Sequence, residues 1–136
     1  MDYLNRLTDI ELLALLIAAE SDNQPLAGQV AVACVPLTRL RRGWWGRDLR
    51  RVILAPWQFS TFNEPPPGHK AHWQWFTHRI GAYTTLALLA IDGLLASPVP
   101  TATHYHPVSV SPTWILSPKM LWLQQIGDHV FYQEVR

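Results

Sequence analysis

The feature that most constrains the fold is an apolar run near the start of the chain that ends in a single carboxyl group. Thr8 and Glu11 have the spacing of a capping box, which predicts the start of a helix. Residues 10–19 form an apolar run that is long enough for three helical turns, and Glu20 follows it directly. The sequence therefore predicts a largely buried helix with an ionisable group in its last turn.

Glu20 is predicted to lie on the apolar side of this helix. Leu13, Leu16 and Ile17 precede it at helical spacing, so all four side chains share one face. Burial and the partial negative charge at a helix C-terminus both raise the pKa of a carboxyl group. A carboxylic acid that stays protonated near neutral pH can act as a general acid. The spacing alone also fits a glutamate that ends the helix and turns outward to solvent.

Three further helical segments are expected, over residues 25–40, 48–54 and 72–96. Pro36 lies inside the first of them and is expected to bend or end it, because proline lacks a backbone donor and its ring crowds the preceding turn. Gly81 is an expected break in the last segment.

The last third of the chain changes character. Residues 101–106 and 130–135 are rich in β-formers and predict two short strands. The expected fold class is α+β, a mainly helical domain with a small β element toward the C-terminus. With 136 residues and 49% hydrophobic content, we expect one catalytic domain over residues 1–136.

Neither an export signal nor a membrane span is predicted. The first residues lack a basic segment followed by an apolar core, and the apolar run at residues 12–19 is far shorter than a bilayer requires. We therefore expect a soluble protein that acts as a monomer.

Four separated blocks of sequence form one ordered pattern, at residues 17–39, 58–60, 103–114 and 126–132. In this order they resemble the spore-cortex-lytic (SleB-type) family of cell-wall hydrolases. The sequence pattern of that family begins with an acid, a short loop, G-Q-x-A-V-A-x-V and N-R. It continues with Q-F-S, then T-H-F-H with P-x-W, and ends with I-G-x-H-x-F-Y. The four blocks span nearly the whole chain.

The resemblance implies a lysozyme-like fold with Glu20 as the catalytic general acid and base. It implies cleavage of peptidoglycan glycan strands between N-acetylmuramic acid and N-acetylglucosamine by a lytic transglycosylase or muramidase, without a cofactor or metal. By the same resemblance, the residues that line or support the saccharide groove are Gln58, Phe59, Ser60, Tyr105, His106, Trp114 and His129.

The chain departs from the family pattern at two places: Gln24 stands where the family has a second acid, and Thr38 replaces the usual asparagine. A hydrolase needs two carboxyl groups around the scissile bond, whereas a transglycosylase can use one. Asp22, Glu64 and Asp128 are candidates for a second acid. The single-acid route is favoured, mainly on the resemblance.

Two alternatives remain open. His104 and His106 would share a strand face, and His129 could join them as zinc ligands of an amidase, although no H-E-x-x-H motif occurs. The arginine-rich segment 39–51 could make the chain a non-catalytic module that binds wall or another anionic polymer. A solvated helix end explains the same arginines, and no nucleic-acid partner is expected.

Seven tryptophans are many for this length. We expect Trp73, Trp75 and Trp122 to pack in the core, and Trp44 and Trp45 to be exposed.

The expected setting is host lysis by a phage. The enzyme would be stored in the host cytoplasm and would reach the peptidoglycan layer after the membrane is permeabilised.

Overall fold

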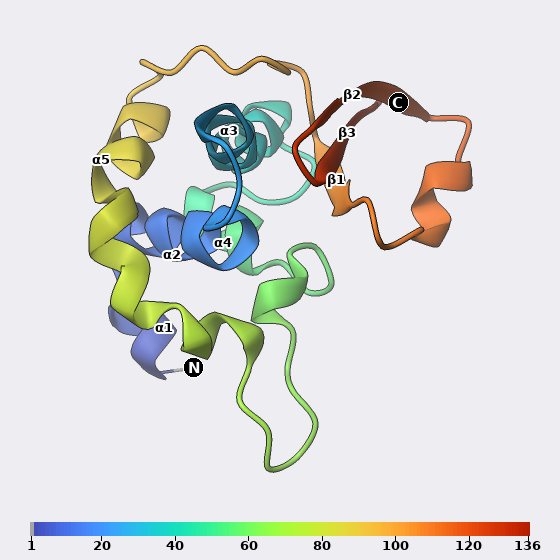
Figure 1. Cartoon of the computed structure of the whole chain (residues 1–136). Coiled ribbons are helices and arrows are strands. Elements are labelled where there is room, and N and C mark those ends of the chain that lie inside the picture. The colour runs from blue at the N-terminus through green and yellow to red at the C-terminus, as the bar shows by residue number, and fades with distance from the viewer. Residues whose placement is uncertain (1) are drawn as a thin grey trace.

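The computed structural model describes residues 2–136, as a group of helices beside a small antiparallel sheet (Figure 1). The helices are α1 Asp2–Arg6, α2 Asp9–Ser21, α3 Leu26–Arg42, α4 Leu49–Leu54 and α5 Ile80–Ile91. The strands are β1 His104–Pro107, β2 Met120–Ile126 and β3 His129–Glu134. Short 3-10 turns lie at Ser60–Phe62, His72–Trp75, Thr77–Arg79 and Thr113–Leu116. The α+β class expected from the sequence is confirmed.

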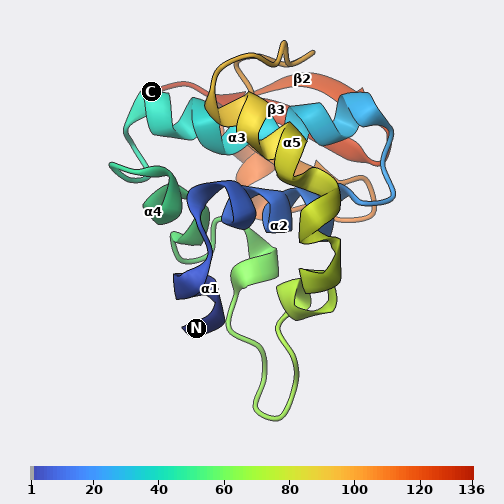
Figure 2. The same ribbon diagram turned by 90° about the vertical axis from the view of Figure 1, so that its left-hand side faces the viewer.

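Helix α2 is the centre of the core. Thr8 caps it as predicted, because its side chain accepts a hydrogen bond from the Glu11 amide while the Glu11 carboxylate accepts one from the Thr8 amide. Every residue of the stretch 12–18 is fully buried. Helices α3, α4 and α5 all contact it, and Figure 2 shows it running through the middle of the molecule. A helix that is apolar on all sides can be stable only when other elements enclose it in this way.

Pro36 does not end α3, so the expectation of a helix end there is wrong. The helix continues to Arg42 and stops at Gly43, which is in the left-handed conformation and donates to the carbonyls of Arg39 and Leu40. The side chains around the proline, including Val32 and Val35, are buried. Their burial offsets the one backbone hydrogen bond that the proline removes.

The segment 72–96 also differs from expectation. It opens with two 3-10 turns, and the α-helix begins only at Ile80. Gly81 does not break the helix, because it lies in the first turn of α5, where its backbone amide needs no partner within the helix. Helix α4 agrees with expectation, and the Asp48 side chain caps it by accepting from the Arg51 amide.

The sheet has the order β1-β3-β2, and both strand pairs are antiparallel. The two predicted strands are present, whereas β2 was missed. Strand β2 is an edge strand with exposed Leu121 and Trp122, and its register shifts between Trp122 and Gln124. These properties remove the alternation of buried and exposed residues by which a strand is recognised in sequence.

The two faces of the sheet have different surroundings. Tyr105 pairs with Phe131 on the face that packs on the helical core, and Phe131 is completely buried. The neighbouring pair, His104 and Tyr132, lies on the opposite face against Trp114.

The expectation for the tryptophans was right only in part. Trp73 is buried, but Trp75 is 61% exposed and Trp122 is 63% exposed. Trp122 is exposed because it lies on the edge strand, and Trp75 packs under Lys70 instead of entering the core. Trp44 and Trp45 are only half-exposed, since arginine guanidinium groups stack on both.

Within residues 2–136, no helix combines the length and the apolar character that crossing a bilayer would need.

Candidate active site

Glu20 lies in the last turn of α2 with a partly buried side chain. Burial raises the pKa of its carboxyl group to about 7, and a hydrogen bond from the backbone of Thr61 opposes this shift. A carboxyl group with this pKa carries its proton for about half of the time at neutral pH, so it can both donate and accept.

Tyr105 lies next to this carboxyl group. Burial raises the pKa of its phenol well above the usual value, and the negative charge of Glu20 raises it further while Arg39 lowers it. The phenol therefore keeps its proton and remains a hydrogen-bond donor. Its hydroxyl is inaccessible to solvent and has no partner among the described residues. An unpartnered buried hydroxyl is unfavourable, which suggests a role for this group beyond packing.

His129 is the second residue with an unpartnered buried atom. Its Nδ1 has no hydrogen-bond partner within residues 2–136, and its ring lies 5.2 Å from that of Tyr105. Burial lowers the pKa of this imidazole, with a further lowering from His106, while Asp128 opposes the shift. The ring is therefore neutral at neutral pH.

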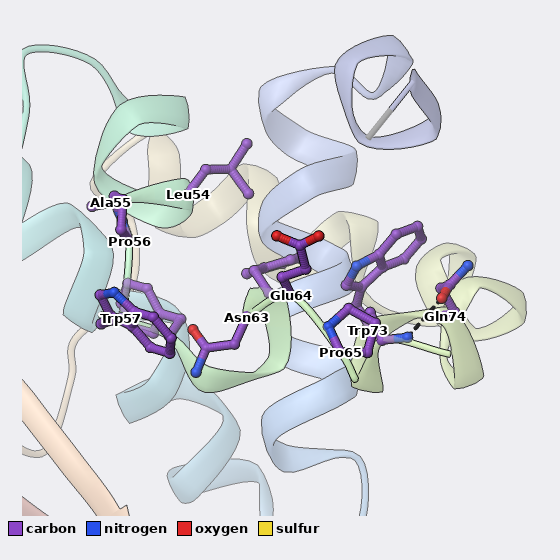
Figure 3. A pocket seen from close by; sticks show the side chains of 12 residues that line it. Leu54, Ala55, Pro56, Trp57, Asn63, Glu64, Pro65, Trp73 and Gln74 are labelled. Atoms are coloured by element: carbon purple, nitrogen blue, oxygen red, sulfur yellow. Dashed lines mark hydrogen bonds between the residues drawn. The ribbon is translucent and has the colours of Figure 1, made fainter. Parts of the chain in front are cut away.

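Two pockets adjoin at Trp57, which lines both. The first, which we call the apolar pocket, has a volume of about 580 Å³ and is shown in Figure 3. In that view Trp57 and Trp73 lie at opposite sides, with Asn63 and Glu64 between them. The apolar pocket is lined by Leu54, Ala55, Pro56, Trp57, Phe59, Phe62, Asn63, Glu64, Pro65, Ala71, Trp73 and Gln74.

The second, which we call the cationic pocket, has a volume of about 400 Å³. It is lined by Arg39, Trp45, Trp57, Gln58, His104, Tyr105, Trp114, Ser117, Lys119, Met120, Glu134 and Arg136. Glu20 interacts with Thr61, which lies between two lining residues of the apolar pocket, Phe59 and Phe62, and with Tyr105, which lines the cationic pocket. Glu20 itself lines neither pocket, and its interactions with Thr61 and Tyr105 connect it to the segments that form their walls.

Trp57 has an unusual conformation for a large side chain. Its φ is +65°, and 81% of its surface is exposed. A left-handed conformation is unfavourable for such a residue and persists only where the surroundings impose it. Here the next residue, Gln58, is fixed by Arg39 Nη1, which donates to its side-chain oxygen over 3.1 Å. The exposed indole is thus held at the junction of the two pockets, where a ligand spanning both would contact it.

The predicted site residues separate into groups. Phe59, Tyr105 and His129 lie together on the core side of the sheet, and Tyr105 interacts with Glu20. Gln58 and Trp114 lie in the wall of the cationic pocket.

Three predicted groove residues line neither pocket: His129, His106 and Ser60. His106 is buried on the other face of the sheet, where its Nδ1 contacts the Pro107 carbonyl and its Nε2 contacts the Tyr132 hydroxyl. Ser60 is exposed at the start of a 3-10 turn and lines neither pocket.

The three candidates for a second acid have different surroundings. Asp22 accepts from Tyr83 and Arg79, and these hydrogen bonds lower its pKa. Asp128 is bound by Gln24, which donates to its carboxylate over 3.1 Å and accepts from its amide over 2.8 Å. Only Glu64 lines one of the two pockets.

The histidines proposed as zinc ligands do not converge. His104 and His106 lie on the outer face of the sheet, and His129 lies on the inner face. In the part of the chain that the structure describes, no three histidine, cysteine, aspartate or glutamate side chains are placed to hold a metal ion.

The arginines of segment 39–51 make different contacts. Arg50 donates to the carbonyls of Leu4 and Leu7 at the end of α1, and Arg51 pairs with Asp48. Arg39 is buried and faces the cationic pocket. The sequence analysis treated these arginines as one patch and missed Arg39 as a site residue. Its spacing from the buried Val32 on the same helix could have revealed it.

A sequence profile described as cell wall hydrolase matches residues 23–132. The match begins after Glu20, so it covers the predicted groove but leaves the predicted acid untested. A spore cortex-lytic enzyme of Halalkalibacterium halodurans is 30% identical over 124 residues, which are 90% of this chain and 34% of that protein. The chain thus spans about a third of the length of this relative.

Two solved structures are similar over nearly the whole fold. The catalytic domain of the germination-specific lytic transglycosylase SleB from Bacillus anthracis gives a TM-score of 0.67 at 25% identity, over 95% of this chain and 98% of that one. The catalytic domain of the Bacillus cereus SleB protein gives a TM-score of 0.67 at 26% identity, over 92% and 89% of the two chains.

Proposed function

This chain belongs to the cell wall hydrolase family, and from this premise we propose that it cleaves peptidoglycan glycan strands between N-acetylmuramic acid and N-acetylglucosamine. We propose Glu20 as the general acid and base. The observation that carries the proposal is the partly buried Glu20 carboxyl group, with a pKa of about 7, next to two adjoining pockets with tryptophan walls. The similarity to SleB catalytic domains supports the same reaction class.

The proposed reaction needs one acid. Protonated Glu20 gives its proton to the bridging oxygen as the bond from the muramyl C1 breaks, and C1 acquires oxocarbenium character. The 6-hydroxyl of the same muramyl residue then forms a new bond to C1, and its proton passes to the Glu20 carboxylate. The product carries a 1,6-anhydro ring, and the enzyme returns to its starting state.

The surroundings of the acid fit this sequence of steps. A pKa of about 7 lets the same group donate a proton and take one back at neutral pH. The exposed faces of Trp57 and Trp114 offer flat apolar surfaces on which sugar rings stack. The Tyr105 hydroxyl stays protonated beside Glu20 and has no partner within residues 2–136, so it can donate to an oxygen of the substrate once substrate binding opens its buried surroundings.

The test is the loss of turbidity of purified cell wall. Glu20→Gln is expected to lower the clearing rate by about 100-fold or more, because an amide cannot donate the proton. The matched control is Glu11→Gln, which makes the same change at the other end of α2 and retains a capping-box residue. Clearing that survives in Glu20→Gln would refute the proposed acid. Wall binding by the wild type without any clearing would favour the binding module.

The reaction type is tested on the products. Mass analysis of digested glycan is expected to show 1,6-anhydro ends, which are one water lighter than reducing ends. Reducing ends alone would show hydrolysis. In that case Glu64 would be the first candidate for the second acid to test by substitution.

We also propose host lysis as the setting, with the protein held in the cytoplasm and acting as a monomer. In a bacterium that expresses the protein, turbidity should fall only after the membrane is permeabilised. Lysis without that treatment would refute the proposed setting.

A further inference from the structure

The cationic pocket carries an excess of positive charge. Arg39, Lys119 and Arg136 line it, and Glu134 is the one carboxylate in its wall. His104 adds no charge at neutral pH, because burial and the nearby Arg39 lower its pKa to about 4. Glu134 is already engaged, since Arg136 Nε lies 2.7 Å from its carboxylate. The pocket therefore has cations without a matching anion.

Arg39 is the cation that lacks a carboxylate partner among the described residues although it is buried. It is only 2% exposed, and within residues 2–136 no carboxylate oxygen lies within 4.0 Å of its guanidinium group. Buried arginines are normally paired with an acid. The rings of Trp45 and Phe59, at 4.9 and 4.7 Å, supply part of the missing stabilisation.

The hydrogen bonds of Arg39 leave one nitrogen free. Nε donates to the Thr103 carbonyl over 2.7 Å, and Nη1 donates to Gln58. Nη2 has no acceptor in the described part of the chain, yet it is not among the solvent-inaccessible unpartnered atoms. It therefore keeps some access to solvent at the pocket that Arg39 lines. An anion there would gain a charge-assisted hydrogen bond from a preorganised donor.

We propose that the cationic pocket binds a carboxylate of the glycan substrate, carried on the lactyl group of a muramyl residue or on the peptide attached to it. This inference rests on the proposed function. The sugar rings of the glycan are uncharged, so its negative charge resides in these two places. Tyr105 lines the same pocket and lies next to Glu20, which puts the carboxylate site close to the proposed cleavage point.

The proposal predicts which glycan strands this chain binds more tightly. Strands that carry free carboxylates should bind better than strands whose carboxylates are neutralised. Lys119 is the residue to replace, because it is exposed and has no ion-pair partner within residues 2–136, so its loss should leave the fold intact. The sequence has one other lysine, Lys70, which is exposed, lines neither pocket and serves as the matched control.

The experiment measures binding by calorimetry in a Glu20→Gln background, so that no cleavage occurs. The probes are peptide-bearing glycan tetrasaccharides and the same tetrasaccharides with their carboxylates converted to amides. Amidation is expected to weaken binding about tenfold. Lys119→Ala should weaken binding of the native probe by several-fold and change binding of the amidated probe much less. Lys70→Ala should leave both affinities unchanged.

A third probe separates the two sources of the carboxylate. In the peptide-bearing probe the lactyl carboxyl group is held in the amide bond to the peptide, so only peptide carboxylates are free. Tetrasaccharides freed of peptide by an amidase carry only the released lactyl carboxylate. Tighter binding of this probe than of the peptide-bearing probe assigns the pocket to the lactyl group, and binding as weak as that of the amidated probe assigns it to the peptide.

Equal affinity for the native, amidated and peptide-free probes would overturn the proposal, and so would the absence of measurable binding by the folded Glu20→Gln variant. Neither result touches the proposed cleavage, which wall clearing by the wild type tests separately.

Discussion

Glu20 owes its proton affinity to the position at which α2 ends. The helix carries the carboxyl group out of the core only far enough to leave it partly buried, and burial is the main cause of its raised pKa. The position on the apolar face of the helix was predictable from spacing. Spacing could not identify its neighbours Thr61 and Tyr105, because they come from a 3-10 turn and a strand that are remote in sequence. Tyr105 was named only through the family resemblance, and Thr61 was not named.

Replacing Glu20 should change how stability depends on pH. The pKa of Glu20 is about 7 in the folded chain against 4.5 for a free side chain, so the folded state holds the proton more tightly. Its contribution to stability is complete below pH 4.5 and is lost as the pH rises through 7. Between pH 4.5 and pH 8, the free energy of unfolding of Glu20→Gln should therefore rise by up to about 3 kcal/mol relative to that of the wild type.

Urea unfolding at the two pH values measures this difference. Glu11→Gln is the control, because hydrogen bonds to Thr8 lower the pKa of Glu11, so its effect on stability falls mainly below pH 4.5 and should change little between the two pH values. A wild-type stability that rises from pH 4.5 to pH 8 relative to Glu20→Gln would contradict a raised pKa.

Tyr105 should matter for activity more than for stability. Tyr105→Phe removes a buried hydroxyl that has no partner, so the free energy of unfolding should change by less than about 1 kcal/mol. The clearing rate should fall about tenfold or more if this hydroxyl donates to the substrate.

Tyr132→Phe is the matched control on the outer face of the sheet. It removes a hydroxyl that contacts His106 Nε2 at 3.2 Å and lines neither pocket. This substitution should lower the free energy of unfolding by about 1 kcal/mol and leave the clearing rate unchanged. A Tyr105→Phe variant with full activity would remove the hydroxyl from the proposed mechanism.

At the scale of elements, two loops are held together across the fold. Gln24, in the turn between α2 and α3, binds both the backbone and the carboxylate of Asp128 in the turn between β2 and β3. An amide can donate and accept at once, whereas the glutamate that the family carries here could not donate to an aspartate. The departure from the family pattern at Gln24 therefore has a structural reason in this chain.

Gly127 should be the sensitive point of this contact. A Cβ at Gly127 would lie 2.4 Å from Gln24 Oε1 and 3.0 Å from Pro25 Cδ, and its φ is +56°. Gly93 has a similar φ of +72° with nothing within 4 Å, so Gly93→Ala isolates the backbone strain. Gly127→Ala should cost about 1 to 2 kcal/mol more than Gly93→Ala in thermal unfolding. Equal losses would mean that the contact between the turns contributes nothing.

The elements that sequence patterns predicted are those with strong local signals. The capping box of α2 and the Asp48 cap of α4 each mark the start of the helix that follows. The errors at Pro36 and β2 have the opposite cause. Burial by distant segments carries α3 through its proline, and pairing with β3 makes a strand of β2, whose side chains are mostly exposed. Local patterns contain neither kind of information.

At the scale of the whole molecule, helices and sheet share one core. Ile126 and Phe131 of the sheet belong to the same buried apolar cluster as the residues of α2. We expect a single cooperative unfolding transition, with coincident midpoints by far-ultraviolet circular dichroism and by tryptophan fluorescence. Separate midpoints would show that the sheet and the helices unfold independently, and would contradict the expected single domain.

The enclosure of α2 has a consequence for motion near the proposed acid. A helix whose residues 12–18 are wholly buried has no route to solvent except through the opening of the entire fold. Amide protons in this stretch should therefore exchange with deuterium more slowly than any others in the protein. Glu20 would then be a reactive group anchored to the slowest-exchanging segment of the chain, while much of the lining of the two pockets comes from the segment 55–65 and from the edge strands β1 and β2.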